Sequence, residues 1–522
     1  MLLTVTRWCF SEESVRGSAA GQEFAAATLN SFRRISCRTA LLIAAVFTGT
    51  PHESRAQILS DAGNTTQSAS DVDRSVQTSA ARADFAPRDI KATKLYSRIK
   101  AALDDVRAID THDHLRAFDQ IPGRVTTTSG YGMTLYSLWS HSYLTRTTRI
   151  SPWPADGSFD TWWREAHDDF DNVRATSFYR YLRPAFRDLY SVEFDTITSA
   201  QARRLNDRIY ANYETDEWLR RVITRRANIE LMFIDPYWNR LQFAREYRFA
   251  VPVLNVTTIM RGSHPDRYAS ASDSPFAYAQ RKEMPTTSFD DFLAVVDELF
   301  VDAVAADTVC LKSTQAYQRT LQYEQVTKEQ ASAVYGRSLQ DTTASQQKQF
   351  EDFMFRHICR LSAKYELPFQ VHTGDARIQG SSPMLLVDVI AANPETKFIL
   401  FHGGYPWVGE TGAIAMTHPN VWIDSCWLPT LSYTMARRAY QEWLDAVPSD
   451  RIMWGADTVD AEGIYAATEF TRECLAEALT GKVSRGELLE QHASRIGRQI
   501  MRENALELFP KLRRMLWRSD AE

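Results

Sequence analysis

The chain has 522 residues and a formal net charge of −5, from 60 lysines and arginines against 65 aspartates and glutamates. This balance excludes the strongly basic surface that nucleic-acid-binding proteins carry. Its 44% hydrophobic content is enough for a large buried core, so the composition predicts a globular protein.

An apolar stretch at 40–47 follows Arg33, Arg34 and Arg38 near the amino terminus. It has the length of the hydrophobic region of a signal peptide and is too short to span a bilayer. We therefore expect residues 1–57 to be a targeting segment that sends the protein to the periplasm or out of the cell. The alternative is a disordered tail with a chance apolar patch on a cytoplasmic protein. Residues 58–89 are rich in Ser, Ala, Asp, Thr and Gln and predict a flexible linker.

Ordered structure is predicted from residue 90, where apolar residues recur at helical spacing up to residue 106. Eight short, mostly apolar segments of strand length follow, at 108–111, 229–234, 251–257, 308–312, 369–372, 398–402, 421–425 and 452–455. The last four begin 23 to 31 residues apart, which is the length of one strand-plus-helix unit. Eight such units predict an α/β protein with a (β/α)₈ barrel, the TIM-barrel fold.

A long segment at 116–225 separates the first two predicted strands and is rich in Trp, Tyr and Phe. Loops at the carboxyl ends of barrel strands can grow without disturbing the core. We therefore expect this segment to be a helical insertion that caps the barrel mouth. Helical patterns after residue 484 predict carboxy-terminal helices, so the barrel domain spans 90–522. No transmembrane span is expected in it.

His112 and His114 stand two residues apart at the end of the first predicted strand. Side chains at alternate positions of a strand share one face, so both rings can reach one metal ion. The pair alone is a weak signal, because such spacings also arise by chance.

Three later strands also end in a residue that can bind a metal: His372, His402 and Asp457. The carboxyl ends of barrel strands meet on one face, so all of these residues are expected to converge with His112 and His114. A single histidine at a strand end is usually part of the hydrogen-bonded structure. Five ligand-type residues at four strand ends favour a metal site instead.

In this order, the residues resemble the amidohydrolase superfamily, and within it the amidohydrolase-2 group, which includes metal-dependent hydrolases and decarboxylases and is akin to the uronate isomerases. The motifs that carry the resemblance are Asp-Thr-His-Asp-His at 110–114, His372, His-Gly-Gly at 402–404 and Gly-Ala-Asp at 455–457. The segment 500–509 is similar to the closing helix of this group. The resemblance covers residues 90–516.

The resemblance implies one divalent metal held by His112, His114, His372 and Asp457. Zn²⁺ is the expected ion, and Mn²⁺ or a second metal are the alternatives. Imidazole and carboxylate ligands suit Zn²⁺, and an open coordination position lets a bound water lose a proton near neutral pH. Asp457 and His402 are the implied catalytic residues. Asp457 would take the proton of the attacking water, and His402 would act as a general acid/base, contact the substrate or complete a second metal site.

Lys312 ends the fourth predicted strand and has three interpretations. It is a carboxylated lysine that bridges two metals, as in some relatives, a contact for an anionic substrate, or part of a structural ion pair. Tyr317, Arg261 and Arg377 lie in loops after strands and are further candidates for substrate binding. The alternative for each of these three is a solvated loop residue.

Three classes of function follow. The one we expect is a metal-dependent hydrolase that uses metal-activated water to cleave a C–N, C–O or lactone bond of a small molecule. The second is non-hydrolytic, as a decarboxylase or a uronate-type sugar-acid isomerase, for which an anchoring Arg or Lys would indicate a carboxylate substrate. The third is an inactive barrel that only binds a ligand, against which the complete ligand set argues. The fold itself does not choose the reaction, and the sequence leaves the number of subunits open.

Overall fold

The computed structural model describes residues 89–520, apart from 242 and 244. The predicted targeting segment 1–57 and all but the last residue of the predicted linker 58–89 lie outside the described residues. Both therefore stay predictions. Within the described range, no helix combines the length and the apolar character that crossing a membrane requires.

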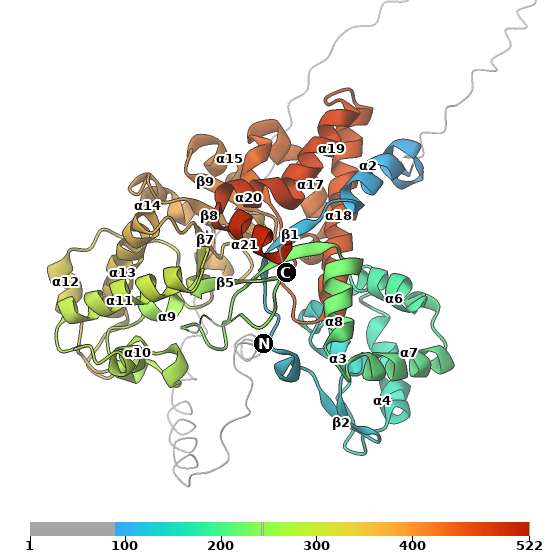
Figure 1. The fold of residues 1–522 in the computed structure, drawn as a ribbon, viewed down its shortest axis with the longest axis horizontal. Coiled ribbons are helices and arrows are strands. Elements are labelled where there is room, and N and C mark those ends of the chain that lie inside the picture. The colour runs from blue at the N-terminus through green and yellow to red at the C-terminus, as the bar shows by residue number, and fades with distance from the viewer. Residues whose placement is uncertain (1–88, 242, 244, 521–522) are drawn as a thin grey trace, which may run out of the picture. The chain divides into compact units, whose positions relative to one another are not determined.

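Eight parallel strands form a nearly closed barrel (Figure 1). In their order around it they are β1 (Ala108–Asp113), β4 (Ile229–Ile234), β5 (Ala250–Asn255), β6 (Cys310–Ser313), β7 (Phe369–Val371), β8 (Phe398–Leu400), β9 (Val421–Asp424) and β10 (Ile452–Met453). The chain after β10 returns to β1, where the Asp457 N–H donates to the His112 carbonyl at 3.0 Å. The predicted (β/α)₈ barrel is confirmed.

The barrel strands are buried because helices cover their outer face and side chains fill their inner face. All six residues of β1 and all six of β5 are buried. Strands buried on both faces are apolar for most of their length, and this is why the sequence marks them so clearly. Polar residues gather where the strands end, as Asp113 and Asp424 do.

Helices on the outside of the barrel connect the strands. They are α2 (Lys94–Asp104) before β1; α9 (Thr257–Met260), α10 (Pro275–Arg281) and α11 (Phe289–Ala305) after β5; α12 (Lys328–Ser332) and α13 (Ala344–Lys364) after β6; α14 (Val387–Ala391) after β7; α15 (Val408–Thr417) after β8; α16 (Leu428–Leu431) and α17 (Tyr433–Ala446) after β9; and α18 (Ala461–Ser484) after β10. Side-chain caps set where several begin. At α13, for example, Thr343 accepts from the Gln346 N–H and the Gln346 side chain accepts from the Thr343 N–H.

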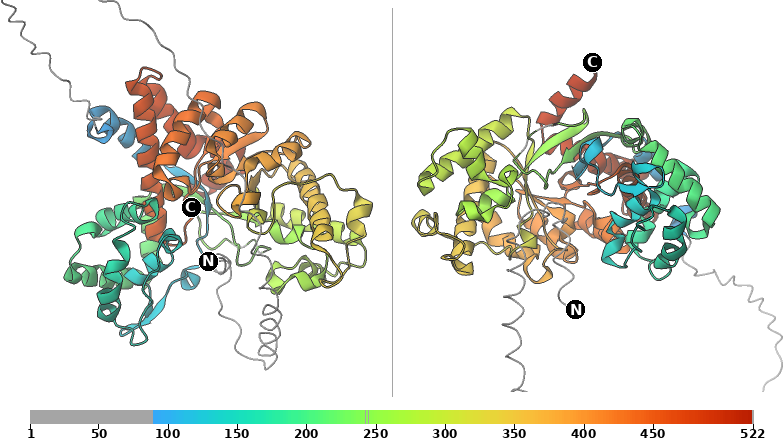
Figure 2. Two further views of the ribbon diagram at one scale, coloured as in Figure 1. Left: turned by 180° about the vertical axis from the view of Figure 1, so that it is seen from behind. Right: turned by 90° about the horizontal axis from the view of Figure 1, so that it is seen from below.

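Between β1 and β4 the chain forms a small hairpin and a series of short helices. They are β2 (Val125–Thr127), β3 (Gly130–Gly132), α3 (Leu135–Ser140), the 3₁₀ helix η3 (Tyr143–Arg146), α4 (Phe159–Ala166), α5 (Ser177–Arg180), α6 (Arg183–Tyr190), α7 (Ser199–Asn212), α8 (Glu217–Arg221) and the π turn η6 (Val222–Arg226). In Figures 1 and 2 these helices gather on one side of the barrel, away from α10 to α13. The Trp139 ring is their centre and packs against Phe170, Tyr179, Phe186 and Phe194.

The carboxy-terminal segment is helical in pieces rather than in one run. It consists of α19 (Glu490–Arg498), the π turn η14 (Gln499–Glu503), α20 (Asn504–Leu508) and α21 (Lys511–Asp520). The buried Asn504 side chain donates to the carbonyls of Ser449 at 2.7 Å and Ile452 at 2.8 Å, which ties the segment to the start of β10. Pro510 separates α20 from α21 because it has no N–H to continue a helix.

His357 in α13 predicts how stability depends on pH. Burial, and then the charge of Arg360, lower the pKa of His357 to about 4, whereas an unfolded histidine titrates near 6.5. Below pH 6.5 this side chain therefore binds more protons in the unfolded chain than in the folded one, and its contribution to stability falls as the pH falls. Between pH 7 and 5, we expect wild type to lose about 1–2 kcal/mol more unfolding free energy than His357→Gln. Urea unfolding of both proteins at several pH values measures this, and parallel pH curves would contradict it.

Candidate metal centre

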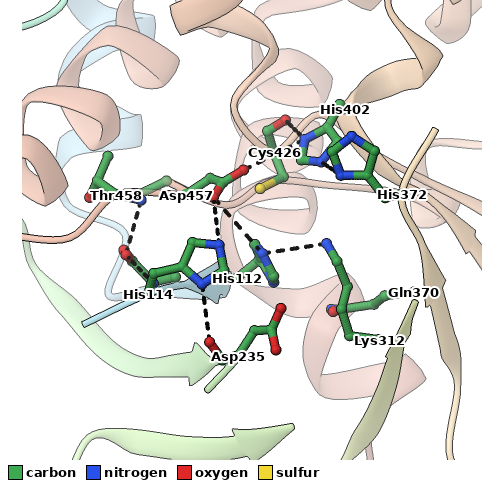
Figure 3. A network of polar contacts seen from close by, with 12 residues as sticks. His112, His114, Asp235, Lys312, Gln370, His372, His402, Cys426, Asp457 and Thr458 are labelled. Carbon is green, nitrogen blue, oxygen red and sulfur yellow. Dashed lines mark hydrogen bonds and ion pairs between the residues drawn. The ribbon is translucent and has the colours of Figure 1, made fainter. Parts of the chain in front are cut away.

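The five strand-end residues singled out by the sequence meet at the carboxyl end of the barrel (Figure 3). The Asp457 carboxylate lies between the histidines. Its Oδ1 is 3.1 Å from His114 Nε2 and 3.9 Å from His112 Nε2, and its Oδ2 is 3.8 Å from His402 Nδ1. His372 contacts the cluster through His402, with Nδ1 at 2.9 Å from His402 Nε2.

The backbone at these strand ends takes up a conformation that is rare for side-chain-bearing residues. His402 has a φ of 61°, Asp457 of 57° and Trp427 of 63°. Left-handed conformations cost energy in residues other than glycine and collect at functional sites, where the surrounding structure enforces them. Here, the turn of the chain after β8, β9 and β10 brings His402 and Asp457 together.

The donor atoms of the His112, His114 and Asp457 side chains fit one metal ion. Ligands bound at about 2.0–2.2 Å lie roughly 3.3–3.6 Å apart around a tetrahedral ion. The separations of 3.1 and 3.9 Å from Asp457 Oδ1 to the two imidazoles bracket that range. Asp235 has a ligand atom within 4.8 Å of those of both histidines, and the same holds for Cys426 with His402 and Asp457. Two imidazoles and a carboxylate are the ligand types that Zn²⁺ and similar ions prefer.

The paired rings of His372 and His402 also fit a nearby cation. His402 Nδ1 faces the Cys426 carbonyl at 3.0 Å, and His372 Nε2 faces the Asp375 carbonyl at 3.2 Å. Both carbonyls need a proton from a ring, and so does the contact between the two rings. Two neutral imidazoles carry only two protons, so one of the three contacts lacks its proton. A positive ion bound to one of these ring nitrogens would remove that conflict.

Burial keeps most of the cluster in the form that binds metals. It lowers the pKa of His112 and His372 well below 6.5, and that of His402 to about 4, so these rings are neutral near pH 7. Burial raises the pKa of Asp457, but the hydrogen bond from His114 and the charges of the histidines outweigh it and hold that pKa well below 3.8. For His114, burial is outweighed by the contact with Asp457, and the pKa is raised. The centre therefore presents one carboxylate among imidazoles.

Two buried carboxyl groups of β1 fasten the Asp457 loop. Asp110 Oδ1 accepts from the N–H groups of His112 at 3.1 Å and Ala456 at 3.0 Å. Asp113 Oδ1 does the same for His114 at 2.7 Å and Thr458 at 3.0 Å. Each carboxyl group thus joins a metal-ligand candidate of β1 to a neighbour of Asp457, and fixes the distance between them.

Asp110 is therefore expected to be needed for its shape and its acceptor oxygen rather than for its charge. Burial raises its pKa to about 7, so a neutral group fits there. We predict that Asp110→Asn, which keeps the acceptor, lowers the unfolding free energy by about 1 kcal/mol, and that Asp110→Leu, which orphans two N–H groups, lowers it by about 2–4 kcal/mol. Thermal unfolding of both variants measures the difference. Equal losses of unfolding free energy would contradict the role of Asp110 as an acceptor for the two N–H groups.

Lys312 and Tyr317 reach the cluster. The Lys312 side chain is buried in β6, and its Nζ lies 3.4 Å from His112 Nε2 and 3.8 Å from the centre of the Phe401 ring. The Tyr317 ring packs on the His372 ring, with 4.5 Å between centroids.

Arg377 and Arg261 lie apart from the cluster. Arg377 is exposed and donates to the Gln318 carbonyl at 2.6 Å, so it joins the loops after β6 and β7. Arg261 ends α9. In the described part of the chain, no hydrogen bond or ion pair links either arginine to the five strand-end residues, and their role in substrate binding stays a prediction.

The structure adds three residues that sequence reasoning missed. The Asp235 carbonyl accepts from His114 Nδ1 at 3.0 Å, which leaves Nε2 to face Asp457. The Cys426 carbonyl faces His402 Nδ1 at 3.0 Å in the same way. Asp235 directly follows β4, and Cys426 lies two residues after β9. The search for ligand-type residues at strand ends, which found His372, could therefore also have found them. The third, Tyr143 of η3, donates to the Asp457 carbonyl at 2.8 Å from the insertion, and no local pattern marks it.

Comparison with known proteins agrees with the strand-end pattern. The amidohydrolase family matches residues 335–511. Protein fluG of Emericella nidulans is 30% identical over 148 residues, which are 27% of this chain and 17% of that protein. The chain therefore matches only a small part of this relative's length.

Two solved structures share the fold over most of the described chain. A uronate isomerase from Thermotoga maritima has a TM-score of 0.64 at 14% identity and covers 80% of this chain and 97% of its own. A protein from Lactobacillus casei, provisionally classed as a metal-dependent hydrolase, has a TM-score of 0.55 at 18% identity and covers 80% and 98%. At these identities the likeness establishes the fold. Together with the match of the amidohydrolase family to residues 335–511, it confirms the resemblance to the amidohydrolase superfamily found in the sequence and supports an enzyme, and the fold is similar to that of the uronate isomerases.

Proposed function

We propose that the chain is a metal-dependent hydrolase that cleaves a C–N, C–O or lactone bond of a small molecule. The observation that carries this proposal is the position of the Asp457 carboxylate. Its Oδ1 faces two imidazole nitrogens, while its Oδ2 faces His402. One carboxylate oxygen can therefore bind a metal while the other accepts a proton, as hydrolysis requires.

His112, His114 and Asp457 would hold the ion, with His372 and Asp235 available as further ligands. When bound, a divalent ion supplies a Lewis acid that makes water acidic near neutral pH and polarises a carbonyl oxygen. We expect Zn²⁺, because it prefers imidazole nitrogen and carboxylate oxygen in a site of few ligands, with Mn²⁺ as the alternative.

Asp457 is the residue that would move the proton. Its low pKa keeps it ionised at neutral pH, so Oδ2 can accept a proton from the attacking water and return it to the leaving group. The Tyr143 hydroxyl donates to the Asp457 carbonyl at 2.8 Å and lies 3.3 Å from Oδ1. This phenol fixes the orientation of the carboxylate.

His402 would assist from the other side of the carboxylate. With a proton on Nδ1 held by the Cys426 carbonyl, the neutral ring has a lone pair on Nε2. His402 can therefore accept a hydrogen bond or a proton at Nε2. His372 Nδ1 lies 2.9 Å from this nitrogen and can donate a hydrogen bond to it.

A second candidate is non-hydrolytic chemistry on a carboxylate substrate, by decarboxylation or uronate-type isomerisation. Lys312 favours it. Its side chain is only 1% exposed, and no carboxylate among the described residues forms an ion pair with it. A buried cation is costly without an anion, and a substrate carboxylate would supply one. A carbamate on Lys312 that bridges two metals remains the alternative for a hydrolase with two ions.

The test separates the two reactions. Zn²⁺-loaded protein is assayed with panels of amides, esters and lactones, and separately for isomerisation of D-glucuronate and decarboxylation of aromatic acids. Hydrolysis of one panel member that a chelator abolishes and Zn²⁺ restores would support the proposal. Isomerisation or decarboxylation without any hydrolysis would transfer the assignment to the second candidate.

A further inference from the structure

We propose that Arg146 and Asp375 form an anion-binding subsite beside the metal centre, where Arg146 exchanges Asp375 for a carboxylate group of the substrate. The inference rests on the proposed function, since it names the substrate class of the same site. It assigns a binding role to a residue of the 116–225 insertion.

The 3₁₀ helix η3 lies against the ends of three barrel strands. At its start, the Tyr143 hydroxyl binds Asp457 after β10. At its end, the Arg146 guanidinium stacks on the Trp427 ring after β9 at 5.2 Å and pairs with Asp375 Oδ2 after β7 at 2.5 Å. These contacts hold Arg146 over the strand ends that carry the candidate metal ligands.

Both residues that contact Arg146, Trp427 and Asp375, also contact a histidine of the cluster. Its partner ring, Trp427, packs edge-on against His402 with 5.5 Å between centroids. The backbone carbonyl of its partner acid, Asp375, lies 3.2 Å from His372 Nε2. A small substrate bound to Arg146 would therefore extend toward His402 and Asp457.

Exposure gives the order in which a ligand meets these groups. The Arg146 side chain is 36% exposed and that of Asp375 is 16% exposed, whereas those of Asp457 and His402 are 8% and 1% exposed. A ligand from solvent thus meets the guanidinium before it reaches the buried cluster.

Arg146 is suited to exchanging one carboxylate for another. A guanidinium binds a carboxylate through two parallel hydrogen bonds, and a partly exposed ion pair contributes little net stability, so replacing Asp375 costs little. The stacking on Trp427 does not involve Asp375 and would keep the guanidinium in place during the exchange. The subsite therefore favours anionic substrates and uses Asp375 to neutralise Arg146 between turnovers.

The test compares acids with their uncharged amides. Calorimetry measures the binding of benzoate against benzamide, and of glucuronate against glucuronamide, to wild type and three variants. Wild type is expected to prefer at least one acid over its amide, and Arg146→Gln to remove about tenfold of that preference. Asp375→Asn, which removes the competing carboxylate, is expected to tighten acid binding several-fold and leave amide binding unchanged.

Arg149→Gln is the matched control, since Arg149 is an exposed arginine three residues further along the same segment. It is expected to bind both ligand types as wild type does. The inference is overturned if wild type shows no preference for an acid, if Arg146→Gln keeps the preference, or if Asp375→Asn weakens acid binding. Metal content and hydrolysis are measured on the same samples. A wild-type protein that prefers an acid but has neither metal nor hydrolytic activity would refute only the proposed function. An active wild-type protein that shows no preference for an acid would refute only the subsite.

Discussion

Asp457→Asn is expected to lower the catalytic rate by at least about a hundredfold, because even residues that only support metal ligands typically contribute 10- to 100-fold. The asparagine side chain would keep the size of the aspartate but would have neither a negative charge to hold a cation nor a carboxylate oxygen to accept a proton. His114, whose raised pKa depends on the Asp457 charge, would lose its partner at the same time.

The control for this variant is Asp168→Asn, since Asp168 is an exposed aspartate whose side chain is 75% accessible. It is expected to keep wild-type activity. Circular dichroism and thermal unfolding should show that Asp457→Asn remains folded, because the barrel strands do not depend on this side chain. An Asp457→Asn protein with full activity would contradict the assignment of Asp457 as a metal ligand and general base.

Glu462→Leu is expected to lower the unfolding free energy by about 3–5 kcal/mol, because it leaves two buried hydroxyl groups and a half-buried indole N–H without an acceptor. The Glu462 side chain is buried in the first turn of α18. It accepts from the Tyr190 hydroxyl at 2.5 Å, the Tyr213 hydroxyl at 2.6 Å and Trp218 Nε1 at 2.8 Å. These donors all belong to the insertion, so the substitution weakens its attachment to the barrel.

Limited proteolysis with urea unfolding measures this effect. Cleavage between 116 and 225 should become faster in Glu462→Leu than in wild type. Glu462→Gln keeps one acceptor oxygen and should lose less stability. Glu473→Gln, a change further along the same helix at a side chain that is 20% exposed, should resemble wild type. Equal protease resistance in Glu462→Leu and wild type would contradict a role for Glu462 in holding the insertion.

The barrel could be predicted because its information is local. A strand buried on both faces, such as β5, is apolar up to its last residue, Asn255, and the residues that follow such a strand lie at the carboxyl edge of the barrel. For this reason, His372 and Asp457, 85 positions apart, could be assigned to one site from sequence alone. The same reasoning was not applied to Asp235, although this residue directly follows β4.

Contacts between remote segments could not be predicted. Tyr143 meets Asp457 across 314 positions, and Glu462 meets Tyr190 across 272, and nothing in the sequence near either tyrosine marks the partner. The grouping within the cluster was also beyond the sequence. The resemblance implied His372 as a ligand beside His112 and His114, whereas the structure pairs its ring with His402. Its role as a ligand stays a prediction.

Metal content per chain, measured by elemental analysis on wild type and His112→Ala, tests the central claim most directly. The arrangement of His112, His114 and Asp457 predicts about one divalent ion per wild-type chain and its loss in a folded His112→Ala protein. Two ions per wild-type chain would instead favour the interpretation of Lys312 as a carboxylated ligand that bridges two metals. A folded wild-type protein that binds no metal, even with divalent ions added, would contradict the account.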